Sequence, residues 1–123
     1  MDLKGGKNMN DNLRMVRGDT FSFTIEIDGL TTDLTGAYFS CKKNKDDNDY
    51  IFQKSLSDGI VKSAETDTSK SYKITVAPAD TNEIVEGNYY YDLQIEVSDE
   101  VFTPLIGILN IVADITRASV ISA

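Results

Sequence analysis

The sequence predicts an all-β fold, an immunoglobulin-like antiparallel β-sandwich of seven or eight strands. Apolar and polar residues alternate with a period of two in several short segments, as in strands that cover a core on one side. Turn-forming residues separate these segments roughly every 8 to 12 residues, and helical periodicity is almost absent. A chain of 123 residues is long enough to bury one hydrophobic core without disulfide bonds.

Three strands are predicted in the first half of the chain. Residues 20–28 alternate strictly between apolar and polar side chains, and Gly29 ends this strand. Residues 37–43 and 50–54 form the next two strands, which the charged tip at residues 46–49 joins as a hairpin.

The middle of the chain predicts a loop followed by one strand. Residues 59–61 form a short apolar element, but residues 62–71 hold no apolar residue except Ala64. This polarity predicts a mobile surface loop. Residues 72–76 alternate again and predict another strand.

A corner between two packed sheets is predicted before the most regular strand of the chain. The segment before Gly87 predicts at most a helical turn, with Asp80 or Thr81 as its cap. Residues 89–97 then place aromatic and apolar side chains on one face. In immunoglobulin-like sandwiches, a tyrosine near the start of such a strand hydrogen-bonds to upstream backbone. Tyr89 is therefore predicted to form a tyrosine corner, with Gly87 and Asp80 as structural residues beside it.

The last predicted strand, residues 103–116, is apolar on both faces. One face carries Leu105, Leu109, Ile111 and Ala113, and the other carries Ile106, Ile108 and Val112. Such a strand needs cover on both faces, and a two-sheet sandwich covers only one. We therefore predict that Ile106, Ile108 and Val112 contact another subunit, with residues 1–15 as a candidate second element of that contact.

The predicted domain organisation has three parts. They are a polar N-terminal arm or leader at residues 1–15, the sandwich at residues 16–117 and a short C-terminal tail at residues 118–123. No apolar stretch approaches the roughly 20 residues that span a bilayer, and residues 1–15 lack the apolar centre of a signal peptide. The sequence predicts synthesis in the cytoplasm without secretion by a signal peptide.

The charge balance disfavours two classes of partner. The chain has 20 acidic and 12 basic residues, which gives a formal net charge of −8. This charge opposes binding to nucleic-acid backbones and to anionic membrane surfaces. We expect neither nucleic acid nor membrane as a partner, and no small-molecule substrate.

The residues of the chain predict no catalysis. Histidine is absent, which removes the commonest general base and a common zinc ligand. Cys41 is the single cysteine; its alternation with apolar neighbours predicts a buried structural thiol. The acidic tip at residues 46–49 lacks the glycine of a calcium loop and is predicted to be solvated. We predict no catalytic, cofactor-binding or metal-ligating residue, and no cofactor.

Several short motifs, taken in order, resemble the sandwich domain of phage upper baseplate proteins. They are Arg17-Gly18-Asp19-Thr20-Phe21, Thr32-Asp33-Leu34-Thr35-Gly36-Ala37, Pro78-Ala79-Asp80-Thr81, Gly87-Asn88-Tyr89-Tyr90-Tyr91-Asp92, Gly107-Ile108-Leu109 and Asp114-Ile115-Thr116. The resemblance implies a structural, immunoglobulin-like domain at the front of a larger chain. In that family the domain docks onto the tail hub, and the C-terminal parts hold receptor-binding proteins. This chain stops soon after Arg117, which implies a stand-alone virion component or an attachment domain without its extension.

Two classes of function are expected from the residues and the resemblance together. The first is a non-enzymatic structural protein of a phage or prophage virion, in the tail or baseplate, with other virion proteins or copies of itself as partners. The second is an immunoglobulin-like binding module for carbohydrate or a host surface, with tyrosines and loop carboxylates as contacts. A head decoration protein is a further alternative. Fold alone does not separate these classes.

Overall fold

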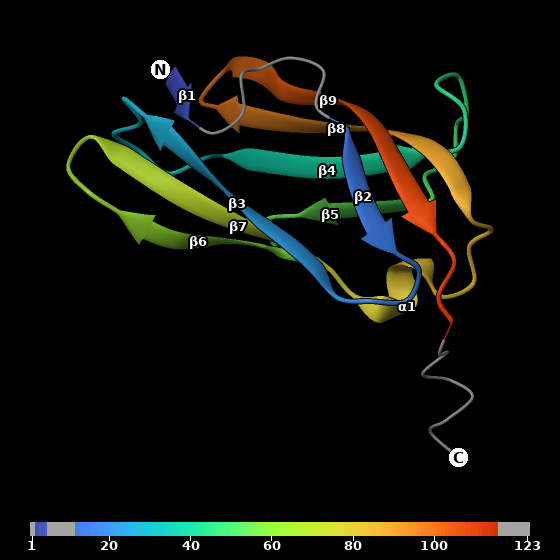
Figure 1. Cartoon of the computed structure of the whole chain (residues 1–123). Helices are drawn as coiled ribbons and strands as arrows, with labels where there is room; N and C mark the ends of the chain where they lie inside the picture. Colours follow the sequence, from blue (N-terminus) through green and yellow to red (C-terminus); the bar gives the residue numbers. More distant parts are fainter. Residues whose placement is uncertain (1, 5–11, 116–123) are drawn as a thin grey trace.

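The computed structural model describes residues 2–4 and 12–115, which form two packed β-sheets (Figure 1). The first sheet has the spatial order β1 (Asp2–Lys4), β3 (Phe21–Asp28), β7 (Ser69–Val76) and β6 (Ile60–Glu65). The second has the order β2 (Leu13–Val16), β9 (Glu100–Val112), β8 (Gly87–Val97), β4 (Gly36–Lys42) and β5 (Phe52–Ser55). The short helix α1 (Pro78–Thr81) lies between β7 and β8. The predicted all-β sandwich is confirmed.

Alternating side chains build the core between the sheets, as the period-2 pattern predicts. On β8 the residues Tyr89, Tyr91, Leu93 and Ile95 are buried, and they face Ile25, Ile27, Tyr72, Ile74 and Val76 of the first sheet within one core cluster. Phe39 lies near the centre, with its ring centroid 5.3 Å from that of Phe23 and 5.5 Å from that of Tyr91. Cys41 is fully buried beside them, as predicted.

The prediction for residues 1–15 is wrong in part. Asp2–Lys4 pairs with β3, and Leu13–Val16 pairs with β9, so both segments belong to the sheets. The β2–β9 pair is parallel, whereas the other strand pairs of the described sheets are antiparallel. Met15 is buried and anchors β2 to the core. Residues 5–11 and the predicted tail at residues 118–123 lie outside the described residues.

The prediction of a loop at residues 62–71 is also wrong, because these residues form most of a β-hairpin. β6 and β7 pair antiparallel across it, with a register shift between Lys62 and Ala64. β6 lies at the edge of its sheet and only Ile60 points into the core, so its sequence lacks apolar alternation. Ion pairs stabilise the hairpin instead: Lys62 Nζ lies 2.6 Å from Glu65 Oε1, and Lys70 Nζ lies 3.1 Å from the same oxygen.

The corner before β8 differs from its prediction in the cap alone. Ala77 is the N-cap residue, and neither Asp80 nor Thr81 occupies that position. Asp80 lies inside the helix and accepts a hydrogen bond from the Ala77 backbone N–H at 2.8 Å. Tyr89 is buried and its hydroxyl donates to the Val85 carbonyl oxygen, so the expected tyrosine hydrogen bond is present. Gly87 has a φ of +149°, a conformation that other residues rarely adopt.

The last strand begins and ends earlier than predicted and contains a bulge. Leu105 pairs with Leu93 and Phe102 pairs with Ile95. Between these two pairs β9 has one residue more than β8, which is a β-bulge. Pro104 lies at this bulge, where a missing backbone N–H is tolerated. Beyond the bulge the alternation is the predicted one, with Leu105, Leu109 and Ile111 buried; Ala113, predicted to face inward, is exposed.

Candidate binding face of the five-stranded sheet

The outer face of the five-stranded sheet gathers aromatic and polar side chains around its middle strand, β8. Tyr90, Asp92, Gln94 and Glu96 alternate with the buried residues of β8 and therefore point away from the core. Three of the four are only half exposed, because side chains of the flanking strands rise beside them. These neighbours follow from the register of β8 with β4 and β9.

The register places one polar row across the centre of this face. Asp92 lies opposite Ser40 of β4 on one side and opposite Ile106 of β9 on the other. Ser40 in turn lies opposite Gln53 of β5, and the Gln53 side-chain amide donates a 2.9 Å hydrogen bond to Ser40 Oγ. The row is therefore amide, hydroxyl, carboxylate and aliphatic side chain, from β5 to β9.

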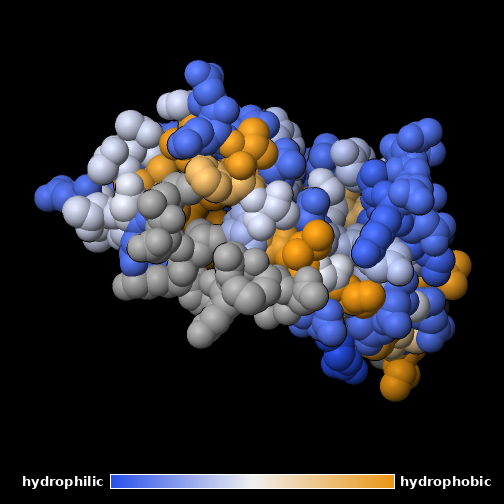
Figure 2. Space-filling view, turned by 90° about the horizontal axis from the view of Figure 1, so that it is seen from above, coloured by the Kyte–Doolittle hydropathy of each residue, from blue (hydrophilic) through white to orange (hydrophobic). Residues whose placement is uncertain are grey.

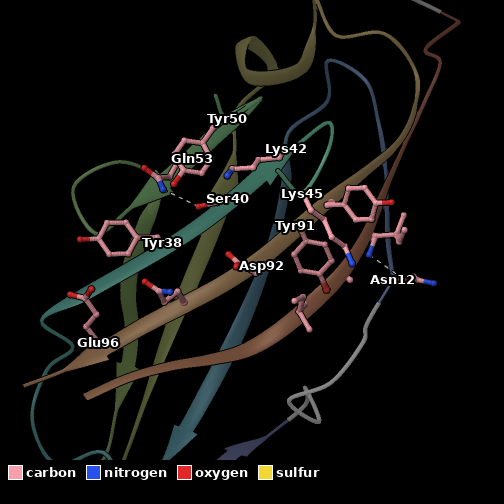
Figure 3. A pocket seen from close by; sticks show the side chains of 15 residues that line it. Asn12, Tyr38, Ser40, Lys42, Lys45, Tyr50, Gln53, Tyr91, Asp92 and Glu96 are labelled. Atoms are coloured by element: carbon pink, nitrogen blue, oxygen red, sulfur yellow. Dashed lines mark hydrogen bonds between the residues drawn. The ribbon is translucent and has the colours of Figure 1, made fainter. Parts of the chain in front are cut away.

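Tyrosines lie on both sides of that row. Tyr38 lies opposite Gln94, two residues along the strands from the row. Tyr90 lies opposite Lys42, two residues from the row in the other direction. Together with the row they line a hollow of about 780 Å³ on the face of the sheet. Figure 3 shows Tyr38 and Glu96 at one end of the hollow, Tyr50 and Lys45 toward the other, and Asp92 between them.

Asp92 is the electrostatically unusual group of this hollow. Partial burial raises the pKa of its carboxyl above the ordinary value, and the positive charge of Lys42 opposes that shift. Among the residues that the structure describes, no side chain donates a hydrogen bond to this carboxylate or pairs with it. The two carboxylate oxygens are therefore available to a ligand that brings donors.

Lysines from the β4–β5 hairpin lie over tyrosine rings at one end of the hollow. Lys42 Nζ lies 5.1 Å from the Tyr50 ring centroid, and Lys45 Nζ lies 5.1 Å from the Tyr90 ring centroid. Such cation–π contacts at exposed sites are weak, about 0.5–1 kcal/mol each. Basic and acidic groups thus border the hollow at opposite ends, since Glu96 lies at the other end.

The apolar row of β9 forms the border of the hollow on the side of β2. Ile106 is 44% exposed, and Ile108 and Val112 are half-buried, so all three lie outside the sandwich core as predicted. Ile106 and Ile108 line the hollow, whereas Val112 lies farther along β9, opposite Val16. The Ile108 backbone N–H donates to Asn12 Oδ1 at 3.2 Å, so this N–H has a partner at the point where the pairing of β9 with β2 begins. Figure 2, seen from the side where β9 is uppermost in Figure 1, shows hydrophobic surface in separate groups among hydrophilic residues.

The predicted structural residues lie apart from this face. Asp80 Oδ2 accepts from the buried Lys54 Nζ at 3.0 Å and so ties α1 to β5. Burial alone would lower the pKa of Lys54. Its hydrogen bonds to Asp80 and Asp58 together outweigh this effect, so the net shift of the pKa is upward. Tyr89 and Gly87 belong to the corner, where Lys43 Nζ lies 4.8 Å from the Tyr89 ring centroid. These three predicted residues therefore shape the scaffold and do not line the hollow.

The Arg17-Gly18-Asp19 turn is held by the same corner. Arg17 Nε lies 2.9 Å from Asp114 Oδ1, and Arg17 Nη1 donates to the Ile84 carbonyl oxygen at 3.1 Å. The Gly18 N–H donates to the buried Thr81 Oγ1 at 2.9 Å. The Arg17 side chain is thus engaged in structural contacts.

Sequence reasoning missed the polar members of the hollow. Tyr38, Ser40 and Gln53 carry no sequence signal of a site, and Gln94 is marked only as one of the alternate, outward residues of the tyrosine strand. In the described ranges, no three acidic or thiol side chains gather as a metal site. The described part of the chain also contains no helix long and apolar enough to cross a bilayer.

Comparisons with known proteins leave the family open. The sequence matches no protein family model and no curated protein. It is similar to a chain of the structure described as "Structural basis of T cell specificity and activation by the bacterial superantigen toxic shock syndrome toxin-1". That similarity has 12% sequence identity and a TM-score of 0.39, and it covers 82% of this chain and 92% of that chain. A likeness this low bears on neither family nor function.

Proposed function

We propose that the chain is a non-enzymatic structural protein of a phage or prophage virion, a tail or baseplate component that docks to a hub or to neighbouring subunits. The motifs that resemble the upper baseplate domain support the virion context. The observation that carries the docking role is the outward apolar row of β9, formed by Ile106, Ile108 and Val112.

The side of the face formed by β9 and β2 suits a subunit contact. The apolar part is concentrated on β9 and β2, where Ile106, Ile108 and Val112 add to Val16.

The energy available from the row is sufficient for association. Burial of apolar surface contributes about 25 cal/mol per Å², so three partly exposed aliphatic side chains supply a few kcal/mol. The fold itself does not need this contribution, because Leu105, Leu109 and Ile111 bury the inner side of the same strand. The docking role can therefore be removed without unfolding the sandwich.

The test replaces an outward aliphatic residue by a charged one. Ile108→Asp and Val112→Asp should abolish self-association in light scattering and incorporation into phage particles isolated on a density gradient. Val61→Asp is the matched control, because Val61 is a 56% exposed β-branched residue on an edge strand of the other sheet. Circular dichroism should show all three variants folded. Wild-type protein that neither self-associates nor enters particles would contradict the proposal, as would Ile108→Asp and Val112→Asp variants that assemble like the wild type.

A further inference from the structure

We propose that the hollow on the outer face of the five-stranded sheet is a binding site for a neutral oligosaccharide. This function lies beyond subunit docking and does not depend on it. The hollow is shaped by Tyr38, Ser40, Gln53, Asp92 and Gln94, on β4, β5 and β8. The outward apolar row of β9, which carries the proposed docking role, lies at the border of the hollow.

Aromatic side chains mark the two ends of the hollow. Tyr38 lies opposite Gln94, and Tyr90 lies four residues from Gln94 along β8, so the two tyrosines are separated by about 14 Å along the strand. Tyrosine offers an apolar ring face together with a polar hydroxyl, which suits the apolar C–H faces and the hydroxyl rim of a sugar ring. A chain of several sugar rings could contact both tyrosines at once.

The floor between the tyrosines is polar, unlike the centre of most protein–protein contacts. Gln53 donates one amide hydrogen to Ser40 Oγ, and within the described ranges no further hydrogen bond engages the Ser40 hydroxyl hydrogen or the Gln53 carbonyl oxygen. Gln94 adds a further amide that can both donate and accept. Sugar hydroxyls also donate and accept, so they match such mixed groups better than an apolar side chain does.

The Asp92 carboxylate provides the strongest acceptor of the floor. It is partly removed from water, and no described side chain compensates it with a hydrogen bond. Hydrogen bonds from neutral donors to a carboxylate are shorter and stronger than bonds between neutral groups. Two neighbouring hydroxyls of one sugar ring can donate to the two oxygens of Asp92, which fixes the ring on the floor.

The charge distribution favours a neutral ligand. Lys42 and Lys45 border one end of the hollow and Glu96 the other, so neither sign dominates the lining. The chain as a whole carries a formal charge of −8, which opposes anionic polysaccharides. A neutral chain meets no repulsion from either end.

The test uses three defined probes: cellohexaose, chitohexaose and maltohexaose, each titrated into ¹⁵N-labelled protein. At least one should bind with a Kd of about 1 mM or lower, and it should shift amide signals of β4, β5 and β8. Asp92→Asn should weaken binding about tenfold, because the amide offers one acceptor in place of two charged ones. Tyr38→Ala should weaken it to a similar extent, about tenfold, through loss of the ring face.

Two controls separate this site from docking and from general surface effects. Asp19→Asn removes an exposed carboxylate in the turn before β3 and should leave the Kd unchanged. Val112→Asp, at a residue that does not line the hollow, should abolish docking while sugar binding persists. The proposal is overturned if none of the hexaoses binds at about 10 mM, or if binding is unaffected by Asp92→Asn and Tyr38→Ala. It is also overturned if those two variants lose particle incorporation instead, which would make the hollow a protein contact.

Discussion

The hydroxyl of Tyr89 donates a hydrogen bond to the backbone carbonyl oxygen of Val85, four residues earlier in the chain. This bond closes the corner through which the chain leaves α1 and enters β8. The Tyr89 ring is buried, while the Val85 side chain points to solvent and is 72% exposed. The start of β8, and with it the outward positions of Tyr90 and Asp92, is thereby fixed relative to the first sheet.

Tyr89→Phe should lower the free energy of unfolding by about 1 kcal/mol, the usual net value of one hydrogen bond. The loss stays small because the freed Val85 carbonyl lies in an exposed segment and can accept from water. Tyr72→Phe provides the comparison, since the Tyr72 hydroxyl accepts from the Leu34 N–H at 3.1 Å in a buried site. That variant leaves a buried donor without a partner and should cost more, about 1–3 kcal/mol. Urea unfolding measures both, and a larger loss for Tyr89→Phe would contradict this ranking.

Much of the sandwich follows from local alternation. β4 and β8 bury the residues that the period-2 pattern selects, and β3 buries Ile25 and Ile27 and half-buries Phe21 and Phe23, because each strand has one face on the core. The outward position of Ile108 on β9 was predictable for the same reason. Tyr89 was predictable because a corner leaves a local signature, a glycine followed by a tyrosine at the strand start.

The missed elements lack such local signals. β6 is an edge strand whose side chains after Ile60 are exposed, so nothing in its sequence alternates. β2 has only four residues, and its assignment depends on a parallel pairing with β9, about a hundred residues later in the chain. The hollow needs the register between strands, because alternation assigns Ser40 and Asp92 to faces but does not place them opposite each other.

Asp80→Asn should destabilise the protein by about 2 kcal/mol or more. Lys54 is buried, and Asp80 is its better shielded partner, with Asp58 as the second at 3.2 Å. Removing the Asp80 charge leaves a buried ammonium with one exposed counter-ion, and loss of a hydrogen bond to a charged group costs about 1.5–3 kcal/mol. Asp58→Asn is the matched control and should cost about 0.5 kcal/mol or less, because exposed pairs contribute little. Equal effects of the two substitutions in chemical denaturation would refute this assignment.

The Asp92 carboxyl should make the stability of the sandwich depend on pH in the direction opposite to a paired carboxylate. Its pKa is raised by burial in the folded state, so the folded protein binds this proton more readily than the unfolded chain does. The contribution of Asp92 to stability therefore improves as pH falls through its raised pKa toward the ordinary value of about 3.9.

Comparison with Asp92→Asn isolates this effect from the other carboxylates. At pH 7 the variant should melt at a higher temperature than the wild type, and the difference should shrink as the pH is lowered toward about 4. Glu65 titrates in the opposite sense, since hydrogen bonds from Lys62 and Lys70 lower its pKa, but it is common to both proteins. A variant that is less stable than the wild type at pH 7 would show that Asp92 is held by a favourable contact.

Cys41 should be unreactive toward thiol reagents as long as the sandwich is closed. Its side chain is fully buried, and burial raises the pKa of its thiol to about 12. At pH 8 the folded protein then holds roughly one thiolate in ten thousand molecules, whereas a thiol in an unfolded chain has a pKa of about 8.5. Reaction with an aromatic disulfide reagent should therefore be limited by opening of the core and should accelerate with added urea.

The destabilised Asp80→Asn variant should react faster than the wild type at pH 8, by a factor set by its loss of stability, about thirtyfold for 2 kcal/mol. Fast stoichiometric labelling of the wild type without denaturant would mean that Cys41 is accessible in the folded protein, and that the packing of Phe39, Cys41 and Tyr91 is looser than described.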